Sequence, residues 1–233
     1  LPACVWSVTT RACRTVVVNS AHALPAHRLS PSPHLQGGRL ELFDANALSC
    51  MLQGVSRAPF DVPHNPETLA LISRLIDVCT YRIEDFKPTE LVNIARATAT
   101  IKEKHKIRSP ADFYRALSLQ AAKHLHALSS FEITGLIWAY AKAGVWSYSL
   151  FGPLMKHITP KLHLFNKLSL LTLSWACLRL QINSPEFTNA IFEAIQRRGN
   201  EFTPAELQRA EENLKLPTTP GLPRAASQDE ELY

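Results

Sequence analysis

The sequence has little glycine and no long apolar run. Only eight of the 233 residues are glycine, which argues against a barrel or sandwich built from many tight turns. The richest apolar stretch, residues 168–180, is interrupted by Ser, Thr, Cys and Arg and is shorter than the roughly 18 residues that cross a bilayer. We therefore expect a soluble protein that does not span a membrane.

Metal-binding and catalytic motifs are also missing from the sequence. There is no CxxC pair, glycine-rich phosphate loop, GxSxG or HExxH motif, and His124 and His126 have no third ligand nearby. We expect a binding module rather than an enzyme, with no metal, cofactor or small-molecule substrate. We expect free thiols at the five scattered cysteines, which are Cys4, Cys13, Cys50, Cys79 and Cys177.

Acidic residues are absent from the first forty positions, where four arginines and several serines occur. This composition is typical of an organellar transit peptide. We expect residues 1–42 to be an extended N-terminal arm or a targeting remnant, and the protein to lie in the mitochondrial matrix. The alternatives are an arm with no targeting role and an arm that follows an RNA surface. Residues 14–18 could add one short strand.

Positive charge is concentrated in the middle of the chain. The net charge of +5 comprises zero for residues 1–85, +9 for residues 86–198 and −4 for residues 199–233. Such a surplus suggests a polyanionic partner, although basic surfaces also serve solubility.

A pattern of an aromatic residue or Leu, four residues, and then Leu or Ile recurs five times. Its copies begin at intervals of 43, 42, 37 and 37 residues, at Phe43, Phe86, Leu128, Phe165 and Phe202. The copies at 86 and 202 place Pro two residues and Glu four residues after the start, as helix N-termini do. The spacing predicts repeated units of about 37–43 residues.

Each unit has the periodicity of two amphipathic helices. In the first helix of three units, Leu91, Ile133 and Leu170 are expected to be buried equivalents, and small residues at 97, 139 and 176 would let helices approach closely. The second helices carry apolar pairs at equivalent positions: Leu71 and Leu75, Phe113 and Leu117, Leu150 and Leu154, Phe187 and Ile191.

This pattern predicts an all-α fold. We expect an α-solenoid of about four helix hairpins and a final helix over residues 43–215, followed by a Pro-rich, acidic tail at 216–233. A single globular helical bundle is the alternative, but it would require no regular period.

The segment Leu136-Ile-Trp-Ala-Tyr-Ala-Lys142 and its weaker copy Leu173-Ser-Trp-Ala-Cys-Leu-Arg179 resemble a known class of organellar repeats. They are similar to heptatricopeptide and octotricopeptide repeats and to the repeats of FAST-kinase-type mitochondrial RNA proteins. The resemblance covers about residues 43–215. It implies a superhelix that binds RNA or that is a subunit of an organellar ribonucleoprotein such as the mitochondrial ribosome.

The densest group of candidate RNA-binding residues lies between the two helices of one unit. A loop is predicted at residues 102–108, where Lys102, Lys104, Lys106 and Arg108 could clamp phosphates. A solvated loop with no ligand is an equal alternative.

Other candidate cations lie at the ends of helices. Lys142 and Arg179 occupy equivalent repeat positions and could follow a phosphate backbone, and Arg197 and Arg198 end another helix. Cations at helix C-termini also stabilise the helix dipole, which is the simpler explanation. Trp138 and Trp175 could stack on bases, but their place beside the apolar stripe favours packing in the core.

These observations favour an RNA-associated subunit of an organellar ribonucleoprotein, most simply the mitochondrial ribosome, with rRNA and neighbouring proteins as partners. The alternative is a protein–protein scaffold or accessory subunit of a mitochondrial membrane complex, which would use the same surface on protein.

Overall fold

The computed structural model describes residues 39–57, 66–105 and 110–215, which form nine α-helices, five short 3₁₀-helices and no strand. The α-helices are α2 (Ala45–Arg57), α3 (Pro66–Tyr81), α4 (Pro88–His105), α5 (Ala111–Lys123), α6 (Ser130–Ala143), α7 (Tyr148–Ile158), α8 (Lys167–Leu180), α9 (Pro185–Gln196) and α10 (Pro204–Leu214). The 3₁₀-helices are η1 (Arg39–Leu42), η2 (Ile83–Asp85), η3 (Leu125–Ala127), η4 (Thr159–Leu164) and η5 (Gly199–Glu201). The prediction of an all-α fold is confirmed for these ranges, and the possible strand at 14–18 lies outside them.

The recurring sequence pattern corresponds to the entry of each hairpin's first helix. Its apolar residue precedes the N-cap, and its Leu or Ile lies one turn inside the helix, which is the spacing of a hydrophobic staple. At α6, Leu128 precedes the N-cap Ser129, and Ile133 follows in the first turn. The Ser129 N–H donates to the Glu132 carboxylate (2.8 Å), and the Glu132 N–H donates to the Ser129 hydroxyl (3.3 Å). Ser129 and Glu132 therefore form a capping box at the start of α6.

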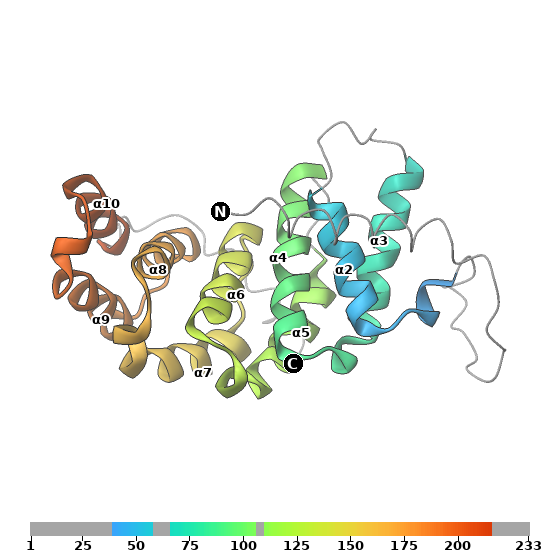
Figure 1. The fold of residues 1–233 in the computed structure, drawn as a ribbon, viewed down its shortest axis with the longest axis horizontal. Helices are drawn as coiled ribbons and strands as arrows, with labels where there is room; N and C mark the ends of the chain where they lie inside the picture. The colour runs from blue at the N-terminus through green and yellow to red at the C-terminus, as the bar shows by residue number, and fades with distance from the viewer. Residues whose placement is uncertain (1–38, 58–65, 106–109, 216–233) are drawn as a thin grey trace, which may run out of the picture.

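The helices pack in two rows (Figure 1). In the first row α2, α4, α6, α8 and α10 contact one another in that order along the long axis of the molecule. In the second row α3, α5 and α7 contact one another in order, and η4 contacts both α7 and α9. Hairpin partners also contact across the rows, as α2 does with α3 and α8 with α9. Consecutive units therefore meet through equivalent helices.

The core lies between the rows and follows the predicted register. Leu91, Ile133 and Leu170 are 1%, 3% and 0% exposed, which confirms that they are buried equivalents. The small residues of the first row are also buried, namely Ala97, Ala139 and Ala176. Because an alanine side chain is only a methyl group, neighbouring first-row helices can approach closely at these positions.

Two details of the helices differ from expectation. The loop predicted at 102–108 begins later, because α4 continues to His105 and Ile101 is fully buried in its last turns. Lys102 and Lys104 are therefore helical. Leu71 is 56% exposed, unlike the other apolar residues chosen for the second helices. Its helix, α3, begins the second row, and no described α-helix precedes it there.

No helix in the described ranges is both long enough and apolar enough to cross a membrane.

Candidate functional site

One face of the first row carries residues that are not fully buried in the core. They lie three or four residues apart within each helix, and therefore on one side of it. We call this surface the first-row face and define it by Gln53 and Arg57 of α2, Asn93, Arg96 and Thr100 of α4, Gly135, Trp138 and Lys142 of α6, and Thr172, Trp175 and Arg179 of α8.

Charge is distributed unequally between the two rows. Helices α2, α4, α6 and α8 together carry seven Lys or Arg and three acids, whereas α3, α5, α7 and α9 carry four and five. The last first-row helix, α10, carries one cation and three acids. Among the described α-helices, the excess of cations over acids therefore lies in the first row and ends at α8.

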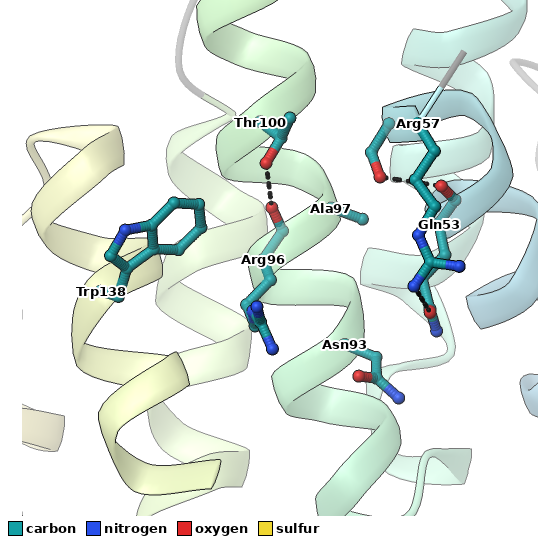
Figure 2. A pocket seen from close by; sticks show the side chains of 8 residues that line it. Gln53, Arg57, Asn93, Arg96, Ala97, Thr100 and Trp138 are labelled. Atoms are coloured by element: carbon teal, nitrogen blue, oxygen red, sulfur yellow. Dashed lines mark hydrogen bonds between the residues drawn. The ribbon is translucent and has the colours of Figure 1, made fainter. Parts of the chain in front are cut away.

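The first-row face contains a hollow of about 210 Å³ over α4. Figure 2 shows its side chains: α2 forms one side, α6 forms the other, and α4 lies between them. The side chains that matter for its chemistry are Gln53, Arg57, Asn93, Arg96, Thr100 and Trp138. The polar groups of three successive units therefore meet at one place.

Arg96 extends from α4 across the surface of α6. Its Cζ atom lies 5.9 Å from the centre of the Phe131 ring and 5.8 Å from that of the Trp138 ring, within the range of cation–π attraction. Its guanidinium forms no hydrogen bond or ion pair with the described residues. Gly135 makes room for it, because a Cβ atom there would lie 3.2 Å from Arg96 Cδ. Arg96 is thus held by rings and keeps its five N–H donors available.

The two tryptophans of the first-row face are partly exposed to solvent. Trp138 and Trp175 are half-buried and pack against the core, as the sequence favoured. Trp138 also borders the hollow, and Lys142 Nζ lies 4.7 Å from its ring centre. Part of its indole therefore belongs to the surface.

Lys142 and Arg179 lie on the first-row face at equivalent positions but have different partners. Lys142 pairs with Glu103 of α4 at 2.6 Å. Arg179 is exposed and forms no hydrogen bond or ion pair within the described ranges. Arg179 is therefore the more available of the two for a ligand.

The four cations of the predicted basic loop do not form one group in the structure. The Lys102 ammonium donates to the carbonyl of Ala143 at the end of α6. Partial burial, together with the nearby positive charge of Arg179, lowers the pKa of Lys102. Lys104 donates to the carbonyl of Ser56 at the end of α2. Both lysines thus bridge neighbouring first-row helices, while Lys106 and Arg108 lie outside the described residues.

Arg198 has a structural role that its sequence position did not indicate. It donates to the carbonyl of Phe165, at the start of the preceding unit, and pairs with Glu201. The hydrogen-bonded pair with Glu201 raises the pKa of Arg198 and lowers that of Glu201. The adjacent Arg197 pairs with Glu193 at 3.1 Å, with 77% of its side chain exposed. Neither lies in a first-row helix.

Arg82 repeats this arrangement at the other end of the molecule. It lies four residues before Phe86, as Arg198 lies four residues before Phe202. It donates to the carbonyl of Phe43 and pairs with Asp85 at 2.8 Å. An Arg followed three residues later by an acid could have identified both arginines as links between units.

Two further cations of the first-row face, Arg57 and Arg96, were not among the residues predicted from the sequence. Arg57 occupies the repeat position of Lys142 and Arg179, so aligning the first unit with the others would have found it. Arg96 occupies the repeat position of Trp138 and Trp175. Its charge alone does not distinguish it from the other cations of the sequence.

The described part of the chain contains no group of three or more His, Cys, Asp or Glu residues that could hold a metal ion. Comparison with protein-family models gives no match, and no curated protein matches the sequence.

Proposed function

We propose that the chain is an RNA-binding helical-repeat protein whose two rows form an α-solenoid, and that it acts by binding rather than by catalysis. We further propose that it is a subunit of a mitochondrial ribonucleoprotein, such as the ribosome of the matrix, in contact with rRNA and neighbouring proteins. The observation that carries this proposal is the concentration of positive charge in α2, α4, α6 and α8.

Electrostatics explains why this surface suits RNA. Lys and Arg side chains that neutralise phosphates release condensed counterions, and this release drives binding of any sequence. Arg57, Arg96, Lys142 and Arg179 provide cations on successive first-row helices. Because α10 has a net charge of −2, the footprint on RNA should extend from α2 to α8 and stop there.

The direct test is a titration of the purified chain with single-stranded RNA at ~50 mM salt, where phosphate contacts are strong. We expect binding that weakens steeply as salt is added. A correctly folded chain that binds no RNA under these conditions would contradict the proposal. Circular dichroism spectra recorded before and after the titration verify that the chain stays folded during the experiment.

A protein partner is the second candidate. Phe131 and Leu168 are 60% and 69% exposed, and they occupy equivalent positions in the first turns of α6 and α8. Exposed apolar side chains in register are suited to a protein interface. If Leu168→Ser abolishes co-purification of a protein while RNA binding is unchanged, this surface serves a protein.

The proposed location can be tested separately. The acid-free, Arg-rich residues 1–40 should direct a fused reporter to mitochondria, because this composition is that of a transit peptide. Imaging with an organelle marker provides the measurement. Replacing the four arginines with Gln should leave the reporter in the cytosol. A reporter that still reaches mitochondria after this change would contradict a targeting role.

A further inference from the structure

Two polar side chains in the hollow over α4 have unused hydrogen-bonding capacity. The Asn93 amide is half-buried and forms no hydrogen bond with the described residues, and neither does the Arg96 guanidinium. The two residues are three positions apart on α4, so they lie on the same side of the helix. A half-buried amide and a guanidinium with free donors form a recognition surface for a polar ligand.

The hollow has the size of a subsite rather than of a complete ligand pocket. Its volume of about 210 Å³ is below the ~300–1,000 Å³ of pockets for drug-sized molecules. Ala97 and the Trp138 indole provide apolar contact, while Asn93 and Arg96 provide polar contact. A flat, partly polar group such as one nucleobase suits this combination.

The chemistry of the two free side chains selects among the bases. Asn forms a paired contact with N6 and N7 of adenine, and Arg forms one with O6 and N7 of guanine. Both contacts use N7, which pyrimidines lack. Unstacked bases of single-stranded RNA expose this edge and can stack on Arg planes.

We propose that this hollow is a subsite for one purine base of the bound RNA, with Asn93 and Arg96 reading its N7 edge. The inference rests on the proposed RNA-binding function. Arg57, on the α2 side of the hollow, is placed to meet the adjoining phosphate. Gly135 is a positioning residue, because it leaves the space across which Arg96 reaches Trp138.

The test compares short oligouridines that differ at one central position. The full chain is titrated at ~50 mM salt with oligomers that carry U, A, G, 7-deazaadenine, 7-deazaguanine or an abasic site there. One paired base contact is worth about 1–3 kcal/mol, so a purine should tighten binding about tenfold over U. The 7-deaza bases keep their stacking surface but lack N7, and they should lose most of this gain without any change to the protein.

Variants then assign the preference to its residues. Asn93→Ala should remove the preference for A, and Arg96→Lys should remove that for G while keeping the charge, since Lys lacks the planar fork. Arg115→Gln, on an exposed second-row position, is the control for a lost arginine and should leave the purine-to-uridine ratio unchanged.

Three results would overturn the inference, and they bear differently on the proposed function. Equal, salt-dependent binding of all oligomers would contradict the purine subsite and leave phosphate binding intact. A purine preference that survives both Asn93→Ala and Arg96→Lys would place the subsite elsewhere. A folded chain that binds none of the oligomers would contradict both proposals.

Discussion

At the scale of single residues, the contacts of a cation decide whether it can bind a ligand. Arg179 and Arg198 both lie near helix ends in a basic segment of the sequence. Arg198 is tied to a backbone carbonyl and to Glu201, whereas Arg179 is exposed on the first-row face. Of these two arginines, Arg179 alone remains a candidate for phosphate contact.

Glu206 should contribute a pH-dependent part of the stability. Its carboxylate accepts hydrogen bonds from Lys167 and from the N-cap Thr203, and these contacts lower its pKa from 4.5 to about 2. A depressed pKa means stability that is present above pH 4.5 and lost as pH falls toward 2. Wild type should therefore exceed Glu206→Gln in free energy of unfolding at pH 6, and the gap should narrow at pH 3. Urea titrations at the two pH values measure this gap; a gap that does not change would contradict the prediction.

Ile133 tests the register of the repeats. It is 3% exposed in the core, and removing its branched side chain leaves a cavity. Ile133→Ala should lower the free energy of unfolding by about 2–5 kcal/mol in chemical denaturation. Gln208→Ala, at an exposed position of α10, is the control and should have an effect within about 0.5 kcal/mol. Equal effects would show that the register is wrong.

At the scale of helices, local features could be predicted from the sequence and tertiary contacts could not. The start of α6 follows from Leu128, Ser129 and Glu132, because staple and cap contacts join residues within one turn. The end of α4 was missed, because Lys102 and Lys104 there bond to carbonyls of other helices, 41 and 48 residues away in sequence. Such partners leave no local pattern.

The same distinction applies to the candidate site. The equivalence of Lys142 and Arg179 could be predicted because it follows from the repeat register. The hollow could not, because it requires α2, α4 and α6 to be placed side by side. The role of Arg96 depends on Gly135, which lies 39 positions later and whose missing side chain provides the space.

Arg198 provides a test of how units are joined. Arg198→Gln removes the link to the Phe165 carbonyl and the pair with Glu201, and should cost about 1–2 kcal/mol of unfolding free energy. Arg197→Gln, one residue away, removes only an exposed ion pair and should cost less than about 0.5 kcal/mol. Thermal and urea unfolding of both variants give the comparison. If Arg198→Gln weakened RNA binding without affecting stability, its structural role would be wrong.

At the scale of the whole molecule, the two rows of helices differ in charge. The second row has five acids against four cations and supplies one side of the core. The first row carries the basic surplus on a face that crosses four helices. A polyanion that follows this face would contact successive units in turn, which is how a repeat protein gains affinity from weak individual contacts.

The central claim is that RNA binds through the cations of the first-row face. The most direct measurement is the salt dependence of RNA affinity for wild type and two triple variants of equal charge. One is Arg96→Gln with Lys142→Gln and Arg179→Gln; the other, from the second row, is Arg115→Gln with Lys123→Gln and Lys156→Gln. Each lost phosphate contact should flatten the slope of log K against log[salt] by about 0.7, so the first-row variant should lose about 2 units of slope and the second-row variant almost none. Equal slopes for the two triple variants would contradict the claim.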